Sequence, residues 1–254
     1  MSTNNSTSKP KVNKFEKDFY SENGFVIMKN IFPAQQIIAL NQEYDDLFNN
    51  KIGIEDGNFF DLGGDKAENT FKMPQLLNPS KYSQIIAKSG IHEICRSIAK
   101  ELMEINNENL IITRDHAIMK PAINSVDTPW HQDEAYLNNR FDHNNCSFWV
   151  PLHNVDFNSG CMCFIPKSHN LGIIEHRHIN NNKKIHGLEA LNVEVENMQI
   201  CPLKIGSATV HNCKTLHYAP ANKSGLPRKA LIIVCTGPKI KLSFPRNFHW
   251  QNNE

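Results

Sequence analysis

Residues 147–165 read Ser147-Phe-Trp-Val-Pro-Leu-His-Asn-Val-Asp-Phe-Asn-Ser-Gly-Cys-Met-Cys-Phe-Ile165 and contain two short apolar runs, one at each end. Each run has the length of a typical β-strand, and the Asn, Ser and Gly before the second run favour a turn. Comparable runs, separated by turn residues, recur at residues 110–112, 117–119, 193–195, 208–210 and 230–235. Many short strands at such spacing predict an antiparallel β-sandwich or barrel.

The first third of the chain has a different, mostly helical pattern. Apolar residues recur there at helical spacing, and Pro and Asn-Gly stand where helices begin and end. The expected elements are a helix at residues 14–23, a strand at 25–28, a helix from 33 to about 48, a loop at 53–70 and a helix from 79 to 102. The sequence therefore predicts a helical N-terminal portion packed on a C-terminal β-sandwich.

Length and composition favour one globular unit. The chain has 254 residues, of which 40% are hydrophobic, and this is enough for one sizeable core. Residues 1–12 are polar and lack the apolar stretch of a secretory signal, so we expect them to form a disordered tail. Residues 13–250 are expected to form a single domain.

Charge and cysteine usage exclude several classes of partner. The 27 Lys and Arg residues nearly balance the 26 Asp and Glu residues, and no block of like charge favours nucleic acid or an anionic membrane. No segment approaches the roughly 20 apolar residues that span a bilayer. The seven scattered cysteines suit reduced thiols better than a disulfide framework. We expect a cytoplasmic protein, and the sequence predicts no particular oligomeric state.

The first stretch that suggests chemistry is Pro129-Trp-His-Gln-Asp-Glu-Ala-Tyr136. If this segment is extended, His131 and Asp133 point to the same face, because side chains alternate along a strand. Two histidines and one carboxylate on one face of an octahedron are typical of non-haem Fe(II) oxygenases. A lone His-x-Asp occurs by chance, so a second histidine is needed before this pattern is informative.

The second stretch supplies that histidine twice. Residues 206–230 contain His211 and His217 in a strand-like segment, and Arg228 lies eleven residues after His217. Either histidine can complete the metal site. A permanently charged, bidentate guanidinium suits the far carboxylate of a dicarboxylate co-substrate whose other end chelates the metal.

With these motifs in place, the sequence resembles the phytanoyl-CoA dioxygenase (PhyH-like) family of Fe(II)/2-oxoglutarate-dependent oxygenases. The resemblance covers nearly the whole chain after the tail. It includes the stretches 19–33, 148–155 and 158–169, together with the two stretches above. It implies a mainly β fold with flanking helices: a double-stranded β-helix (jelly roll, cupin-like) with N-terminal helices packed on the sheet.

The resemblance also implies roles for individual residues. The iron ligands would be His131, Asp133 and His217, since family members carry a similar His-x5-His and use its second histidine; His211 would then lie in the core or beside the ligands. Arg228 would bind 2-oxoglutarate. Trp149 would line the co-substrate pocket, and Lys72 resembles a lysine that closes over 2-oxoglutarate, although an ordinary surface role is an equal alternative.

Two positions depart from the family pattern. The family often has Ser, which hydrogen-bonds 2-oxoglutarate, where this chain has Ala219, so that contact is lost or is supplied by another group. Lys167 replaces the Gly of a Pro-Gly-Ser-His turn, so the turn is open to change. His116 and Lys120 precede the first motif and could face the pocket, with a structural role as the alternative.

The remaining candidates are expected to be structural or to wall the pocket. Gln132 and Glu134 should point away from the metal, and His176 and His178 should lie exposed in a polar loop. Cys161 and Cys163 are interpreted as small buried residues, with metal binding a distant second. Aromatic side chains that can wall the substrate pocket, or pack in the sheet, are Phe71, Trp130 and Tyr136.

The implied activity is a 2-oxoglutarate-dependent dioxygenase that uses Fe(II) and O₂ to hydroxylate a C–H bond of a small organic metabolite, releasing succinate and CO₂, with ascorbate helpful in vitro. Desaturation, epoxidation or cyclisation would use the same ligands. A non-catalytic cupin-like protein that binds a metal or ligand is an alternative. A zinc hydrolase is another, although no general base such as that of His-Glu-x-x-His is evident.

Overall fold

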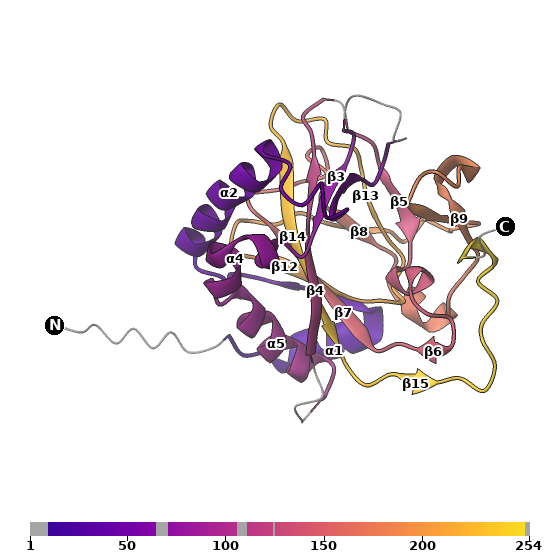
Figure 1. Ribbon diagram of the computed structural model, residues 1–254. Coiled ribbons are helices and arrows are strands. Elements are labelled where there is room, and N and C mark those ends of the chain that lie inside the picture. The colour runs from indigo at the N-terminus through magenta and orange to yellow at the C-terminus, as the bar shows by residue number, and fades with distance from the viewer. Residues whose placement is uncertain (1–9, 65–70, 106–110, 124, 252–254) are drawn as a thin grey trace.

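Two antiparallel β-sheets face each other and form a jelly roll, as expected (Figure 1). The computed structural model describes residues 10–64, 71–105, 111–123 and 125–251. The larger sheet has the strand order β1 (Phe25–Met28), β12 (Ala208–Asn212), β7 (Asn145–Pro151), β14 (Arg228–Thr236), β4 (Ile111–Lys120), β3 (Pro74–Leu77) and β2 (Phe59–Asp61). The smaller sheet has the order β11 (Gln199–Cys201), β8 (Met162–Phe164), β13 (His217–Ala219) and β5 (Thr128–His131).

The two faces of the larger sheet carry different cores because side chains alternate along each strand. On β14, Leu231 and Ile233 point outward and join the core beneath the helices. The intervening Ile232 and Val234 point inward and pack with residues of the smaller sheet, such as Phe164. The inner face is therefore where a cavity between the sheets can form.

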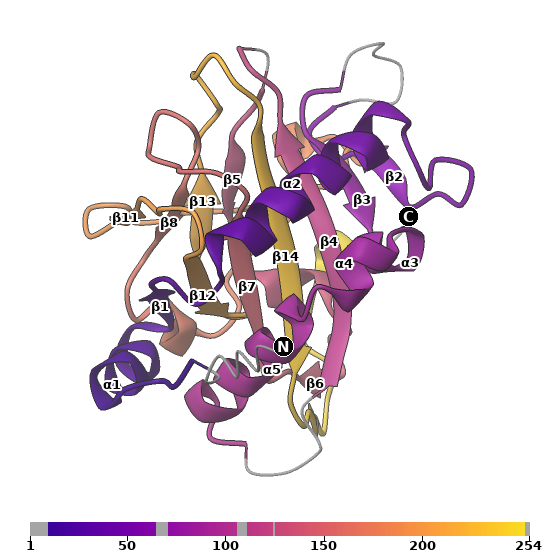
Figure 2. The same ribbon diagram turned by 90° about the vertical axis from the view of Figure 1, so that its left-hand side faces the viewer.

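Helices from the first third of the chain cover the outer face of the larger sheet (Figure 2). The long helix α2 (Ala34–Asn49) crosses that face and buries Ile37, Leu40 and Tyr44. The other helices are α1 (Lys14–Asn23), α3 (Pro79–Tyr82), α4 (Gln84–Lys88) and α5 (Ile91–Leu102). The helices thus leave the inner face free to build a site.

Local signals explain the ends of α1. The Asn13 side chain accepts the Glu16 backbone N–H, and the Glu16 carboxylate accepts the Asn13 N–H, which forms a capping box. Gly24 ends the helix in the left-handed conformation, with φ of 79°. A side chain at Gly24 would also collide with His169 and Thr215, so both its backbone and its packing require glycine. The predicted helix at residues 14–23 is confirmed.

Several other predicted elements are wrong in detail. The helix expected from residue 79 to 102 is broken at Ser83, which caps α4, and at Gly90, which has φ of 80°. The expected loop at residues 53–70 contains the strand β2, and residues 65–70 lie outside the described part of the chain. The apolar run at residues 193–195 forms no strand. The runs at 110–112 and 117–119 fall in one stretch, β4, with residue 110 outside the described part.

Shorter elements complete the fold. Two small sheets pair β9 (His176–His178) with β10 (Leu188–Ala190), and β6 (Phe141–Asp142) with β15 (Ile240–Lys241). Short 3₁₀ helices are η1 (Asp133–Tyr136), η2 (Ser168–Leu171), η3 (Ile179–Asn181) and η4 (His249–Gln251). Of the tail expected at residues 1–12, residues 1–9 lie outside the described part, and Val12 is already packed in the core. Among the described helices, none has the length and apolarity needed to cross a membrane.

Candidate active site

Three side chains converge at the inner face of the smaller sheet. His131 ends β5, and His217 begins β13 and pairs with it directly across the two strands. Asp133 lies just beyond, in the first turn of η1, and not on the strand as the alternation argument assumed. One ligand atom from each of the three lies within 4.8 Å of the others, close enough for all three to bind one metal ion. The carboxylate reaches the site because the chain turns after residue 132.

The two imidazoles are held in the tautomer that a metal requires. The Nδ1 atom of His131 lies 2.8 Å from the carbonyl oxygen of Pro129, and the Nδ1 atom of His217 lies 2.9 Å from that of Thr215. Each Nδ1 therefore carries a proton and donates it to a carbonyl. The Nε2 lone pairs of both rings are left to face the site, in the manner usual for metal-binding histidines.

The two oxygens of Asp133 have separate surroundings. Its Oδ2 atom accepts a hydrogen bond of 2.8 Å from the Ser147 hydroxyl and lies 3.3 Å from Nε2 of His211. Its Oδ1 atom instead lies 3.5 Å from Nε2 of His217 and 3.9 Å from Nε2 of His131. One oxygen is thus fixed by the protein, and the other faces the two imidazoles.

Burial and mutual proximity set the ionisation of this group. Burial holds the pKa of His217 well below its usual value, and the neighbouring imidazoles lower it further. Burial likewise lowers the pKa of His131, although the carboxylate opposes this effect. Burial alone would raise the pKa of Asp133, but the surrounding imidazoles lower it well below its usual value. Neutral imidazoles and an ionised carboxylate are the forms that bind a divalent metal.

His211 does not share a strand with His217, contrary to the expectation from the sequence. It lies on β12 of the larger sheet, and the chain turns before His217 starts β13 of the smaller one. The two rings still meet across the gap between the sheets, with centroids 4.4 Å apart. His211 is only 3% exposed, and neither of its ring nitrogens has a hydrogen bond of good geometry within the described residues. It therefore lies beside the three-residue group, against the oxygen of Asp133 that Ser147 holds.

A cavity of about 350 Å³ opens from this group between the two sheets. Its walls include Ile118, Met162, Ile232 and Val234, which make it largely apolar. Three aromatic residues were open to either role, walling the cavity or packing in the sheet, and of these Tyr136 lines the cavity. Phe71 instead packs against Phe59, and Trp130 stacks on Tyr218. The cavity can thus hold a co-substrate and a small organic molecule out of bulk water.

A buried arginine lines the same cavity. Arg228 is 2% exposed, and its Nε and Nη1 atoms have no hydrogen-bond partner within the described residues. Its guanidinium lies 5.3 Å from the ring centroid of Trp149, which also lines the cavity. Burial lowers the pKa of Arg228 to about 10, so the group stays charged at neutral pH. An unpaired buried cation is costly, and it fits a site that receives a carboxylate.

Lys120 supports the protein beside Arg228 and does not line the cavity. It is fully buried, and its ammonium donates hydrogen bonds of 2.6 and 2.9 Å to the carbonyls of Ala219 and Pro220. These carbonyls follow His217 closely in the chain, so Lys120 fixes the segment that leaves β13. Of the two sequence alternatives for Lys120, the structure favours the structural one.

Three further positions singled out in the sequence lie in different places. His116 lines the cavity, and burial lowers its pKa to about 4. Lys72 does not line the cavity, and its backbone N–H donates to the Asp61 carboxylate. Lys167 has φ of 65°, so it keeps the left-handed turn that a glycine would make.

The residues on either side of Asp133 anchor it from behind. The fully buried Gln132 side chain donates to the carbonyls of Gly172 and Lys214, and its backbone N–H donates to Nε2 of His176. His176 is therefore buried, and the expectation that it is exposed in a loop is wrong. Gln132 and Glu134 do not line the cavity, as expected.

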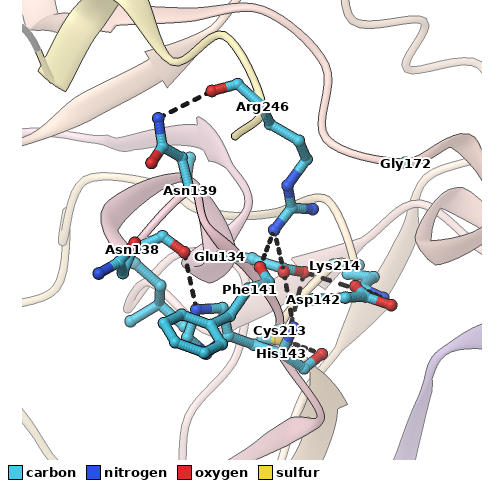
Figure 3. A network of polar contacts seen from close by, with 12 residues as sticks. Glu134, Asn138, Asn139, Phe141, Asp142, His143, Gly172, Cys213, Lys214 and Arg246 are labelled. Atoms are coloured by element: carbon cyan, nitrogen blue, oxygen red, sulfur yellow. Dashed lines mark hydrogen bonds and ion pairs between the residues drawn. The ribbon is translucent and has the colours of Figure 1, made fainter. Parts of the chain in front are cut away.

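Glu134 belongs to a second buried network (Figure 3). Its carboxylate accepts the backbone N–H of His143 and pairs with Arg246 at 2.5 Å, from the C-terminal segment. Lys214 approaches the same carboxylate at 4.0 Å and pairs with Asp142 at 2.6 Å. The turn that carries Asp133 is thus tied to the nearby segment at residues 142–143 and to two distant parts of the chain, at Lys214 and Arg246.

Sequence reasoning missed Ser147, although a signal was present. Ser147 and Asn145 stand two and four residues before Trp149 on β7, so they share its inward face, and all three line the cavity. The alternation from Trp149 would have placed both in the site. The same alternation from His116 on β4 would have placed Arg114 in the site, whereas His186, which also lines the cavity, carried no comparable signal.

A jelly roll whose cavity combines two imidazoles, a carboxylate and a buried guanidinium has the features of the mononuclear non-haem iron, 2-oxoglutarate-dependent oxygenases. The model of the phytanoyl-CoA dioxygenase (PhyH) family matches residues 20–230, and the chain belongs to this family. Its enzyme class is that of the 2-oxoglutarate-dependent non-haem iron dioxygenases, which use Fe(II) and 2-oxoglutarate.

Individual relatives agree with this assignment. The chain is 22% identical over 224 residues to a probable alpha-ketoglutarate-dependent hypophosphite dioxygenase of Stutzerimonas stutzeri, covering 84% of this chain and 75% of the relative. Among solved structures, EvdO2 from Micromonospora carbonacea var. aurantiaca, complexed with 2-oxoglutarate, has a TM-score of 0.82 and 29% identity over 96% of this chain and 98% of that one. SnoK, a non-heme alpha ketoglutarate dependent carbocyclase from nogalamycin biosynthesis, shares the fold, with a TM-score of 0.69 and 19% identity over 91% and 86%.

Proposed function

We propose that this enzyme hydroxylates a C–H bond of a small organic molecule, with iron bound by His131, Asp133 and His217 and 2-oxoglutarate bound by Arg228. The observation that carries the proposal is the meeting, in one cavity, of a two-histidine, one-carboxylate group with a buried guanidinium that forms no ion pair with any residue the structure describes. A dicarboxylate with one end at the metal and the other at a guanidinium fits this pair of features.

The donor set suits Fe(II). Imidazole nitrogens and a carboxylate oxygen are borderline and hard ligands that Fe(II) accepts, and the three together leave positions open for co-substrate and O₂. The protonated Nδ1 atoms fix both rings, while Ser147 donates a hydrogen bond to Oδ2 of Asp133 and leaves Oδ1 facing the two imidazoles. We therefore expect Asp133 to bind through Oδ1 alone.

When bound, Fe(II) supplies the oxidising chemistry, in which oxidative decarboxylation of 2-oxoglutarate to succinate and CO₂ is coupled to transfer of one oxygen atom from O₂ to the substrate. The protein contributes binding, orientation and exclusion of water. Arg228 fixes the position and orientation of the co-substrate, and the Trp149 ring packs against the guanidinium. The apolar walls keep water from the reacting atoms.

The test is iron content and 2-oxoglutarate turnover of matched variants. Asp133→Ala and His217→Ala should abolish iron-dependent succinate formation and lower the iron bound per chain. His211→Ala should keep much of both, and His249→Ala, a half-exposed histidine, should keep all of both. Full activity of the His217 variant would overturn the ligand assignment.

Product analysis then distinguishes hydroxylation from the other outcomes open to the same ligands. Candidate metabolites are screened for succinate release with Fe(II), O₂ and ascorbate, and the product is analysed by mass spectrometry. Gain of one oxygen atom with every carbon–carbon double bond of the substrate retained, checked by NMR, supports hydroxylation, whereas the same gain with loss of a double bond indicates epoxidation. Loss of two hydrogens indicates desaturation or ring formation, and complete absence of succinate under every condition supports the non-catalytic binding protein.

A further inference from the structure

The cavity contains a second arginine in addition to the one assigned to 2-oxoglutarate. Arg114, on β4, lines the cavity and is exposed at its mouth. Among the described residues that line the cavity, Asp133 is the sole acid, and its oxygens face the three histidines and Ser147. The cavity therefore has a cation that no carboxylate of the lining neutralises.

The acidic neighbour in sequence is already paired elsewhere. Asp115 follows Arg114 directly, but alternation along β4 turns it to the outer face, where it is 4% exposed. There it accepts a hydrogen bond from the Ser80 hydroxyl and lies 3.2 Å from Nε2 of His92. Within the described part of the chain, no ion pair or hydrogen bond of the Arg114 side chain is present, so its charge is available to a ligand.

Strand register separates Arg114 from the proposed co-substrate site. Arg228 pairs with Lys120, and Arg114 pairs with Val234, six residues further along the same two strands. At about 3.3 Å per residue this spacing is about 20 Å. The two guanidinium groups thus lie toward opposite ends of this strand pair, so the carboxylate that Arg228 binds is out of reach of Arg114.

The same register brings Arg114 level with the metal-binding group. Val234 pairs with Arg114 on one side and with Ser147 on the other, and Ser147 holds Asp133. Two strand spacings, about 10 Å, thus separate the backbones of Arg114 and Ser147. Both side chains point from the sheet into the cavity, so a small molecule in the cavity can lie between the guanidinium and the metal-binding group.

A second observation places another polar contact in this part of the cavity. Asn145 is 5% exposed and lines the cavity two residues from Ser147, on the inner face of β7. Its Oδ1 atom has no hydrogen-bond partner within the described residues. A buried amide oxygen without a hydrogen bond is costly unless a donor group of a ligand satisfies it.

We propose that Arg114 and Asn145 form the recognition site for the primary substrate, with Arg114 binding an anionic carboxylate or phosphate group of that molecule. This inference rests on the proposed oxygenase function, which supplies the reaction. The anionic group anchors the molecule at the mouth, and its C–H bonds then lie over the metal-binding group. Neutral molecules of the same shape lack this anchor.

The direct test measures binding of inorganic phosphate to the enzyme loaded anaerobically with Fe(II) and 2-oxoglutarate. Calorimetry should detect phosphate binding to the wild type. Arg114→Gln should weaken this binding about tenfold or more, because it removes the charged hydrogen bond, whereas Arg114→Lys keeps a charged donor and should largely keep the binding. Arg140→Gln is the matched control, because Arg140 is an exposed arginine that does not line the cavity. Equal weakening by both Gln variants overturns the proposal. Phosphate binding that occurs with Fe(II) alone but is lost in the enzyme loaded with 2-oxoglutarate also overturns it.

Two more readouts separate this inference from the proposed function. Paramagnetic relaxation of the phosphate ³¹P signal by Fe(II) should accompany binding and disappear with Arg114→Gln. If calorimetry detects phosphate binding that depends on Arg114 but the ³¹P signal is not relaxed, the anion site is supported and the assignment of the metal ligands is overturned. In the substrate screen, acids should stimulate succinate formation at least tenfold more than their methyl esters, and Arg114→Gln should abolish that preference. Equal stimulation by esters in the wild type overturns the anion site and leaves the oxygenase function intact.

Discussion

Replacement of Arg228 by Met should change stability and co-substrate affinity in opposite directions. Burial lowers the pKa of Arg228 from 12.5 to about 10, which corresponds to a cost of about 3 kcal/mol for the charged form in the folded state. The contact with Trp149, at 5.3 Å, returns about 1 kcal/mol. An apolar side chain of similar length therefore should stabilise the protein without 2-oxoglutarate by about 2 kcal/mol, or roughly 4–8 °C in Tm for a chain of this size.

The same substitution should remove most of the affinity for 2-oxoglutarate. Truncation of one partner of a buried, charged hydrogen-bonded pair costs about 2–5 kcal/mol, which is about 30-fold or more in affinity. Thermal unfolding is measured with and without 2-oxoglutarate at constant Fe(II) under anaerobic conditions. The wild type should gain stability with rising 2-oxoglutarate concentration, whereas Arg228→Met should start higher and respond little.

The neighbouring residue provides the matched control. Lys229 pairs with Asp45 at 2.5 Å on the outer side of the sheet, so Lys229→Met should lower stability slightly and leave the response to 2-oxoglutarate unchanged. A lower Tm for Arg228→Met together with an unchanged KM for 2-oxoglutarate would falsify the reasoning. That result would mean that Arg228 is a structural cation with a partner inside the protein.

Three further outcomes are expected. Ser147→Ala removes the hydroxyl that holds Asp133, and affinity for iron should fall about 10-fold or more in a metal titration, as is usual for groups that orient ligands; an unchanged affinity would show that the carboxylate needs no such support. Burial lowers the pKa of His176 to about 4, below its value of about 6.5 in the unfolded chain. Unfolding then takes up a proton between these values, so stability should be lost as pH falls from 6.5 to 4, by up to about 3 kcal/mol, and urea titrations of His176→Gln should give a flatter profile. Lys120→Met leaves two buried carbonyls without donors and should destabilise the protein by about 2 kcal/mol or more. Lys120→Arg can still donate to both carbonyls, so calorimetric unfolding should show little loss of stability for it.

The sequence was sufficient for the parts of the molecule that local chemistry determines. The capping box at Asn13 and Glu16 and the glycine after it define α1 within the chain itself. Alternating or continuous apolar runs gave β7 and β14, because these strands lie in the middle of a sheet with a core on each side. The motif residues His131, Asp133 and His217 do meet in space, as the resemblance implied.

Features that depend on distant pairing were not predictable in the same way. The strand β3 begins with Pro74 and exists because it pairs with β4, and β2 exists because it pairs with β3. His176 belongs to a polar segment, yet it is buried because it accepts a hydrogen bond from the backbone of Gln132, 44 residues away in the chain. Such contacts have no local signature, since the partner is chosen by tertiary structure.

The location of Asp133 has a consequence for how this scaffold can change. His131 and His217 form one rung of a paired ladder, so a one-residue slip of either strand would turn its imidazole to the other face and break the pair. The carboxylate instead stands on a separate 3₁₀ turn, anchored through Gln132 and Glu134. Position 133 can therefore accept a different side chain without disturbing either strand, and the identity of the third ligand is the part of the metal centre most open to evolutionary or engineered alteration.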